Sequence, residues 1–376
     1  MIQIKTPEIY VSEPNAIKSL GLFVKKYGKR ALIVWSTTAK KVTEDAIIES
    51  LGIQKIFYQE YLFSGYPTLE TAYDIAREAK ESEIEIIIAV GGGRVLDTSK
   101  AAGDIAKIPV ASVPTIAATC AAWAALSVIY TAEGNFDHFR HNEHSPQVVV
   151  ADTVILAGAP ERYLKAGIVD TLAKWYETSV GYEALKSDFS YINSVNGALL
   201  AYDFLEEHAA AVVDNARRNI IDDNTVKTID TIIFLAGNVG SYVGEKAYSG
   251  FAHPFYHSSR IVPETRDTLH GEIVAFGLLV QAVLEKKSEE ELYSIIEKFS
   301  ELDVAFTLEE IGIAEKAEEK LQTIEERIYN AFPGLILLEN NRGDGTIINA
   351  AYKADEYVKR FRREQNYGDS EGKRRA

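Results

Sequence analysis

The chain has 376 residues, of which 40 are Lys or Arg and 55 are Asp or Glu, so its formal net charge is −15 at pH 7. This balance excludes a nucleic-acid-binding protein that works through a broadly basic surface. With 47% hydrophobic and 25% charged residues, the composition is that of an ordinary globular protein, long enough for two domains.

The first half of the chain alternates between helical and strand-like patterns. Helical periodicity predicts helices over 14–27, 38–51, 68–82 and 95–106. Runs rich in Val and Ile predict strands over 30–35, 54–59, 84–90 and 109–114. This alternation indicates crossover units and a parallel sheet with helices on both faces. Two further β-like runs, 125–131 and 147–151, flank Glu133-Gly134 and predict a hairpin that closes the domain.

The pattern changes after Ala159-Pro160, where strand-like runs end and helical periodicity takes over. Helices are predicted over 161–181, 188–209, 223–245, 266–286 and 288–300. Because Pro160 suits the first turn of a helix, we expect an α/β domain over 1–159 and an all-helical domain over 160–376. The tail from Arg360 onward has little apolar surface to bury and is expected to fray.

The single cysteine and the apolar runs bear on cellular compartment and on metal binding. Cys120 cannot form an intramolecular disulfide or build a cysteine-based zinc site, so any metal must be held by histidine and carboxylate. The sequence has no stretch of roughly 18 consecutive apolar residues, and its start lacks the regions of a signal peptide. We therefore expect a cytoplasmic protein.

The sharpest motif is a buried strand that runs into three glycines and then a helix, at Gly91-Gly92-Gly93-Arg94. Glycines at this place would let backbone N–H groups approach a pyrophosphate, which the helix N-terminus also attracts. A glycine-rich turn without a ligand is the alternative. The motif is neither Gly-x-Gly-x-x-Gly nor a Walker loop, because the Gly-Lys-Ser/Thr ending is missing.

The helical half carries candidate metal ligands in three separate segments: Asp170, His253 and His270. Each is a weak signal alone, because an isolated His or Asp is more often a cap, a surface group or a buried structural residue. His257 follows His253 at a spacing that places both on one face of a helix, although Pro254 lies between them. A further cluster in a polar stretch is interpreted as part of a solvated loop: His138, His141 and His144.

Together these motifs resemble the metal-dependent, iron-containing alcohol dehydrogenase family in its glycerol dehydrogenase-like branch. The resemblance is carried by segments 91–100, 113–119, 126–130, 166–177 and 253–272. It implies a Rossmann-like dinucleotide-binding domain, a helical domain in a dehydroquinate synthase-like architecture, and one divalent ion, Zn²⁺ or Fe²⁺, in the cleft between them. By motif position it makes Asp170, His253 and His270 the metal ligands. It places NAD or NADP at Ser36, Gly92, Gly93, Arg94, Asp97, Thr115, Leu126 and Tyr130.

Departures from the family pattern bear on the substrate and the cofactor. Glycerol dehydrogenases carry an aspartate that contacts the polyol where this chain has Cys120, and segments 114–123 and 172–177 resemble hydroxycarboxylate dehydrogenases instead. We therefore expect a small 2-hydroxy acid and its 2-oxo acid as substrates, with a polyol as the alternative. Ser36 replaces an aspartate that holds the ribose in many NAD-using members, so NADP is also a candidate, helped by Lys40 and Lys41.

Other residues leave the mechanism and the activity open. His257 is a candidate proton relay, and Arg260 is a candidate partner for a carboxylate unless it faces solvent. Val169 and Tyr256 add bulk beside the site, so a non-catalytic relative that binds metal and dinucleotide is a further alternative. A dehydroquinate synthase-like lyase is disfavoured because the quoted segments offer few basic side chains. We expect a homo-oligomer that binds a small molecule and neither nucleic acid nor membrane.

Overall fold

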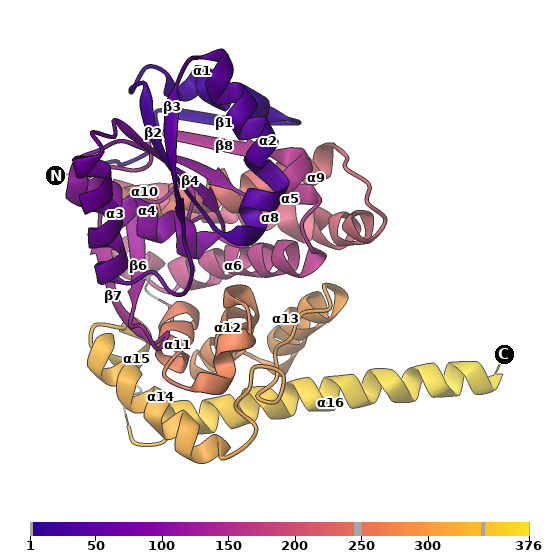
Figure 1. Ribbon diagram of the computed structural model, residues 1–376. Helices are drawn as coiled ribbons and strands as arrows, with labels where there is room; N and C mark the ends of the chain where they lie inside the picture. Colours follow the sequence, from indigo (N-terminus) through magenta and orange to yellow (C-terminus); the bar gives the residue numbers. More distant parts are fainter. Residues whose placement is uncertain (1–2, 244–249, 340–342, 376) are drawn as a thin grey trace.

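The computed structural model describes residues 3–243, 250–339 and 343–375. Within these residues every strand lies between Ile9 and Asp152, and only helices and loops follow (Figure 1). The predicted fold class, a parallel-sheet α/β half followed by a helical half, is confirmed. The boundary between residues 159 and 160 stays a prediction. No helix of the described residues is long and apolar enough to cross a membrane.

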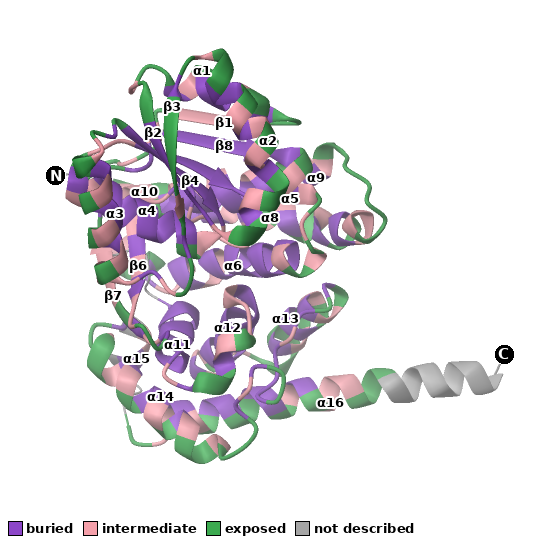
Figure 2. Ribbon diagram, in the orientation of Figure 1, coloured by how far each residue is buried: buried purple, intermediate pink, exposed green. Residues whose placement is uncertain are grey.

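Six strands form one parallel sheet in the order β1-β8-β5-β4-β2-β3. Their bounds are Ile9–Glu13 (β1), Arg30–Trp35 (β2), Phe57–Leu62 (β3), Ile86–Gly91 (β4), Val110–Pro114 (β5) and Val148–Asp152 (β8). The four inner strands are buried along almost their whole length, as Figure 2 shows for β4 and β8, because helices cover both faces. The predicted strands coincide with β2, β4 and β5 within two residues, and β3 begins three residues later than expected.

The pairing predicted for the closing hairpin was wrong. β6 (Leu126–Tyr130) pairs antiparallel with β7 (Phe136–His141), whereas β8 lies between β1 and β5 in the main sheet. The run Val-Val-Val-Ala of β8 needs burial on both faces, which only the interior of the sheet provides. β7 was not predicted as a strand because its sequence is rich in charged residues and histidines. His138 and His141 were expected in a loop but lie on β7.

Helices cover the two faces of the sheet and divide the core. Helices α1 (Leu20–Val24) and α2 (Thr37–Ile53) pack on one face, against alternate side chains such as Ile33 and Ile88. Helices α3 (Leu69–Glu81) and α4 (Gly93–Ala106) pack on the other, and this second core continues into the helical half. The site described below borders this second core.

The connections of β2 and β4 leave in opposite directions at one edge of the sheet. These two strands are neighbours, yet the chain passes from β2 to β3 on one side and from β4 to β5 on the other. In open α/β sheets, ligands bind outside the carboxyl ends of the strands at such a switch point. Ser36 follows β2 and the glycine loop follows β4, so both lie at this point.

The helical half contains the elements that carry the metal ligands. Its helices are α5 (Thr153–Ala157), α6 (Glu161–Ser179), α7 (Tyr182–Leu185), α8 (Phe189–Arg217), α9 (Asp223–Asp230), η2 (Thr231–Leu235), α10 (Ala236–Val243), α11 (Ala252–Ser259), η4 (Pro263–Asp267), α12 (His270–Leu284), α13 (Glu289–Glu301), α14 (Ala317–Ala331), α15 (Ile336–Glu339) and α16 (Thr346–Arg375). In Figure 1, α6 crosses the middle of the molecule, with the sheet on one side and α11, α12 and α13 on the other. Two glycine contacts show how closely it packs. A Cβ on Gly167 would lie 2.1 Å from the Ala117 carbonyl oxygen, and one on Gly271 would lie 2.0 Å from that of Ala166.

Three predictions about the helices differ from the structure. The helix expected over 223–245 is broken by the π-helical turn η2, and residues 244 and 245 lie outside the described residues. The helix expected from 266 begins at His270, after the short 3-10 helix η4. The tail from Arg360 was expected to fray, but α16 continues through it. The side chains of Arg360 and Arg362 pair with Glu289 and Glu310 and hold its first part to the body.

Candidate metal centre

Three helices of the C-terminal half bring the candidate ligands together. Asp170 lies in the middle of α6, His253 in the first turn of α11, and His270 at the start of α12. Helix α11 forms in spite of Pro254, because this residue also lies in the first turn, where its missing N–H has no helical partner to lose. The sequence expectation of three converging side chains therefore matches the tertiary arrangement.

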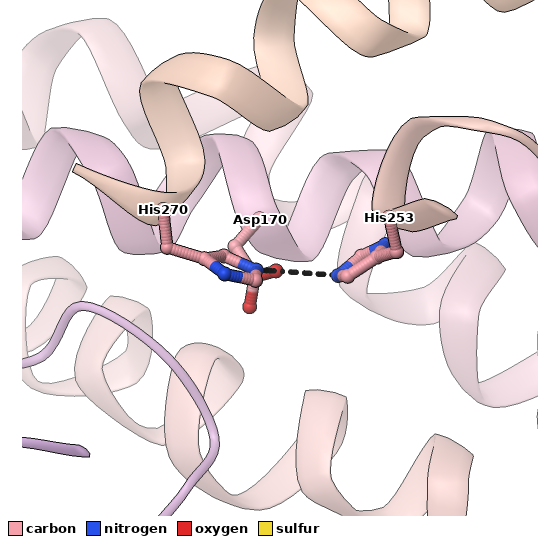
Figure 3. A group of neighbouring side chains, drawn as sticks. All are labelled: Asp170, His253 and His270. Atoms are coloured by element: carbon pink, nitrogen blue, oxygen red, sulfur yellow. Dashed lines mark hydrogen bonds and ion pairs between the residues drawn. The ribbon is translucent and has the colours of Figure 1, made fainter. Parts of the chain in front are cut away.

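The donor atoms of these residues face one another. Oδ1 of Asp170 lies 3.0 Å from Nε2 of His253 and 3.0 Å from Nε2 of His270 (Figure 3). One ligand atom from each residue fits within 4.8 Å of the other two. Two imidazole nitrogens and one carboxylate oxygen form a donor set that suits Zn²⁺ or Fe²⁺ and leaves coordination positions for water or substrate.

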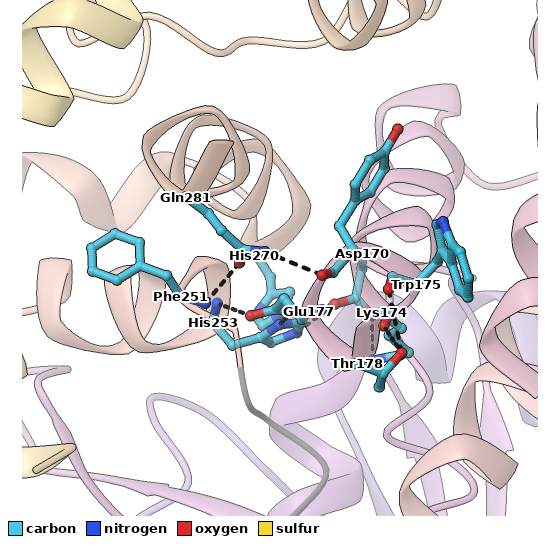
Figure 4. A network of polar contacts seen from close by, with 10 residues as sticks. Asp170, Lys174, Trp175, Glu177, Thr178, Phe251, His253, His270 and Gln281 are labelled. Atoms are coloured by element: carbon cyan, nitrogen blue, oxygen red, sulfur yellow. Dashed lines mark hydrogen bonds and ion pairs between the residues drawn. The ribbon is translucent and has the colours of Figure 1, made fainter. Parts of the chain in front are cut away.

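Glu177 orients His253 from the side opposite Asp170. Its carboxylate is fully buried and contacts Nδ1 of His253, and it accepts a hydrogen bond of 2.9 Å from the His253 backbone N–H (Figure 4). A Cβ on Gly250 would lie 2.4 Å from Cγ of Glu177, so the chain approaches Glu177 closely there. With the proton of His253 on Nδ1, Nε2 presents its lone pair to a metal.

Glu177 was not among the site residues predicted from the sequence. Its spacing from Asp170 could have indicated a shared site, because residues seven apart in the sequence lie two turns apart on one face of a helix. The segment that supplied Asp170 to the family resemblance ends on Glu177, but only the structure shows what this carboxylate contacts.

The electrostatics of the site favour a bound cation. Burial opposes ionisation of Asp170, but Lys174 and the two histidines hold the pKa of its carboxyl well below the usual range. Burial alone would lower the pKa of the His253 imidazole, and the Glu177 and Asp170 carboxylates instead raise it to about 9. Donors that attract a proton this strongly also attract a metal ion, which replaces that proton on binding.

Replacing Glu177 with Gln is expected to weaken zinc binding about 10- to 100-fold, the range typical of partners that orient a metal ligand. The amide keeps the size of the side chain but loses the charge that holds His253 in one tautomer. Chelator competition on the purified protein measures the zinc affinity. Glu183, an exposed glutamate on α7, supplies the control Glu183→Gln, which should bind zinc as the unchanged protein does. Equal affinities for the two variants would contradict an orienting role.

His257 lies beside the candidate ligands in an aromatic pocket. Its ring centroid lies 4.6 Å from that of Phe136, 4.8 Å from that of Phe139 and 6.3 Å from that of His270. Nδ1 is buried and has no hydrogen-bond partner among the described residues. Burial and the neighbouring His270 and His253 put the pKa of His257 well below its usual range, so the imidazole is neutral at pH 7. His257 is not part of the group of donor atoms formed by Asp170, His253 and His270.

The glycine loop lies where the sequence analysis placed it. Gly92 caps α4 and Gly93 is its first residue. A Cβ on Gly92 would lie 2.8 Å from Cδ1 of Ile116, so the backbone packs closely against the segment after β5. The N–H of Thr115 donates to the Gly91 carbonyl oxygen at 3.2 Å, and Ser36 caps the N-terminus of α2. These four predicted cofactor positions therefore share one edge of the sheet.

A chain of aromatic contacts joins this loop to the metal centre. The Arg94 guanidinium lies 4.4 Å from the centre of the Tyr66 ring, and Tyr66 stacks on Tyr130 at 6.0 Å. The Tyr130 and Tyr256 hydroxyls lie 3.0 Å apart, and the Tyr256 ring meets His270 edge-on at 4.1 Å. Sequence reasoning identified Arg94 and Tyr130 but missed Tyr66, which carries no motif and lies in a loop between β3 and α3.

The remaining predicted cofactor residues, Asp97 and Leu126, contact Lys100. Asp97 is buried and pairs with Lys100 at 2.9 Å, and the Lys100 ammonium donates to the carbonyl oxygens of Ala121 (2.7 Å) and Leu126. This pair thus ties α4 to the segment that contains Cys120. The residue Cys120 is half-buried as a whole, its thiol lies within electrostatic reach of Asp170, and burial raises the pKa of that thiol.

Two basic side chains that were considered for anionic groups have other partners. Lys40 pairs with Glu60 and, at 3.3 Å, with Glu44. Arg260 does not face solvent. It is buried, and its guanidinium donates to the carbonyl oxygens of Thr265 at 2.6 Å and Arg266 at 3.4 Å.

Comparisons with known proteins agree with this arrangement. Residues 7–153 match the family described as iron-containing alcohol dehydrogenase. The chain is 30% identical over 352 residues to the glycolaldehyde reductase of Halobacterium salinarum, an alignment that covers 88% of this chain and 94% of that protein. It is 31% identical to the glycerol dehydrogenase of Pseudomonas putida, over 86% of this chain and 88% of the relative. It is 30% identical to hydroxycarboxylate dehydrogenase A of Escherichia coli, over 74% and 76%.

A solved structure supports the fold. The crystal structure of a probable glycerol dehydrogenase from Sinorhizobium meliloti superposes with a TM-score of 0.85, over 96% of this chain and 99% of that one. The two sequences are 23% identical, so this likeness concerns the fold alone.

Proposed function

Because the chain belongs to the iron-containing alcohol dehydrogenase family and is an oxidoreductase that acts on alcohols, we propose that it interconverts a small 2-hydroxy acid and its 2-oxo acid. The observation that carries the proposal is the convergence of Asp170, His253 and His270 on one point, with the Cys120 thiol within electrostatic reach of Asp170. Hydride would pass between the substrate carbon and NAD(P), the cofactor that the family implies. The family likewise implies a divalent metal such as Fe or Zn.

The substrate class depends on Cys120 and its surroundings. Similarity alone does not select it, since the chain is about equally identical to a glycerol dehydrogenase and to a hydroxycarboxylate dehydrogenase. Cys120 supplies no carboxylate to bind polyol hydroxyls, which favours the acid over the polyol. A glycerol or polyol dehydrogenase is the second candidate.

We assign the roles of the site residues from their positions. Asp170, His253 and His270 would hold the ion, which would supply a Lewis acid to polarise the substrate carbonyl and lower the pKa of the hydroxyl. The neutral His257 imidazole relays a proton to or from the substrate. Backbone N–H groups at Gly92 and Gly93 bind the pyrophosphate. The other cofactor contacts are Ser36, Arg94, Asp97, Thr115, Leu126 and Tyr130, and Cys120 contacts the substrate.

The choice between the two nicotinamide cofactors depends on the segment after β2. Ser36 offers no charge to repel a 2′-phosphate, which permits NADP. Lys40, however, already pairs with Glu60 and Glu44, so its charge is not reserved for a phosphate. This pairing favours NAD.

We further propose a division of the chain into two domains, a cytoplasmic location and a homo-oligomeric assembly. Residues 1–159 bind the dinucleotide and residues 160–376 hold the metal. The single cysteine agrees with a reducing cytoplasm. The protein works as a homo-oligomer, which light scattering of the purified protein tests.

Oxidation of NADH by the zinc-loaded or iron-loaded protein is expected with 2-oxobutanoate or 2-oxoglutarate and not with dihydroxyacetone. The loss of reduced-nicotinamide absorbance measures it, with NADH and NADPH compared for each substrate and metal. If dihydroxyacetone were the only substrate reduced, the protein would be assigned as a polyol dehydrogenase and not as a hydroxy acid dehydrogenase. Tight binding of metal and cofactor without turnover of any carbonyl would favour a non-catalytic relative.

A further inference from the structure

Lys174 is a buried cation in the wall of the metal centre. It lies one helical turn after Asp170 on α6, and its side chain is 5% exposed. Its Nζ lies 3.7 Å from Oδ2 of Asp170, the oxygen other than the one that contacts the two histidines. Figure 4 shows Asp170, Lys174 and Glu177 along the same helix. Residues at this spacing share one face.

Cys120 shares this neighbourhood. The Lys174 ammonium opposes the effect of burial on the pKa of the Cys120 thiol, and Asp170 acts on the same thiol, so the three groups lie within electrostatic reach of one another. Cys120 is partly open to solvent, whereas Asp170 and Lys174 are buried. A molecule bound between Cys120 and the metal would therefore lie in the field of the ammonium.

The charges of the metal centre and of Lys174 favour an anionic ligand. A divalent ion and Lys174 bring three positive charges, and Asp170 and Glu177 bring two negative ones. Metal-bound imidazoles are neutral, so these groups together carry one positive charge. A carboxylate forms its strongest hydrogen bonds with cationic donors such as an ammonium.

We propose that Lys174 selects substrates that carry a carboxylate next to the reacting carbon, by pairing its ammonium with that carboxylate. This inference rests on the proposed function, and it assigns Lys174 as the residue that determines which class of substrate the enzyme accepts. A polyol hydroxyl gains less from a buried ammonium, because it carries no charge.

The test is binding of oxamate, an unreactive analogue of a small 2-oxo acid, to the zinc-loaded protein with NADH, measured by calorimetry. Lys174→Met keeps the length of the side chain and removes its charge. It should weaken oxamate binding at least about tenfold, the loss expected for one charge-assisted hydrogen bond. Lys165→Met is the matched control, since Lys165 lies on the same helix, is 8% exposed and pairs with Asp303. It should bind oxamate as the unchanged protein does.

The zinc affinity of the same variants separates a substrate contact from a structural role. If Lys174 faces the substrate, removing its charge leaves zinc binding unchanged or tighter, because one repulsive charge is gone. A side chain that only positioned Asp170 would instead lose zinc affinity and oxamate together, and that result would overturn the proposal.

The outcomes also distinguish this inference from the proposed function. Equal oxamate affinity with and without Lys174, or no oxamate binding by the unchanged protein, would overturn the role of Lys174 even if alcohols were oxidised. Oxamate binding that depends on Lys174, in a protein that reduces no 2-oxo acid, would uphold the anion site and reject the proposed reaction.

Discussion

Replacing His270 with Ala is expected to lower turnover at least about a thousandfold, because it removes one of three metal ligands. Polarisation of the substrate oxygen by a metal contributes several kcal/mol to the rate, and each 1.36 kcal/mol is about tenfold. The glycine loop lies on another element, so NADH binding should change little. Metal content, NADH fluorescence and the steady-state rate together measure the result.

The control for this variant is His144→Ala, because His144 is exposed after β7 and pairs only loosely with Glu143 at 3.7 Å. It should retain metal, cofactor binding and activity. A metal-free His270→Ala protein that still transferred hydride at the normal rate would remove metal chemistry from the mechanism.

Replacing Gly271 with Ala is expected to destabilise the folded protein by about 3 kcal/mol or more, at the upper end of the range for overpacked cores. The added methyl group would lie 2.0 Å from the Ala166 carbonyl oxygen and 2.6 Å from its carbon. Both are backbone atoms of α6, so no side chain can turn away. Because α6 carries Asp170 and α12 begins at His270, the forced separation should also weaken zinc binding.

Gly240 on α10 provides the matched control, since among the described residues no atom outside the adjoining backbone of its own helix lies within 4 Å of the Cβ that Gly240→Ala would add. In an exposed helix this change removes backbone freedom from the unfolded chain and should stabilise the protein by roughly 0.5–1 kcal/mol. Urea unfolding of the metal-free proteins measures both effects. Similar midpoints for the two variants would show that α6 and α12 can separate without cost.

The sequence was most informative where the structure depends on short-range pattern. Runs of Val and Ile that alternate with helices identified the parallel sheet, because strands buried on both faces are predominantly apolar. The three glycines where β4 passes into α4 marked the loop at the switch point, because this signal is also carried by neighbouring residues in the chain. Pro254 was misleading as evidence against a helix, because its effect depends on the position in the turn and α11 begins just before it.

The metal ligands of the candidate site could be predicted from the sequence, but the residues that surround them could not. Asp170, His253 and His270 could be named from three motifs of a resembled family. Glu177 and Lys174 lie on the helix of Asp170, yet nothing in their spacing says that one contacts His253 and the other faces Oδ2 of Asp170. Tyr66 could not be found at all, since its contacts with Arg94 and Tyr130 join a loop to two other elements.

The sequence by itself therefore determined the fold class, the glycine loop and the kinds of side chain that could hold a metal. Only the tertiary structure decided that β8 joins the main sheet, that β7 pairs with β6, and which carboxylate and ammonium flank the ligands. The physical reason is the separation along the sequence over which each interaction acts. Helix periodicity, strand alternation and turn chemistry act between neighbours in the chain, whereas pairing partners and buried charges are selected by contacts between residues far apart in sequence, such as His253 and Glu177.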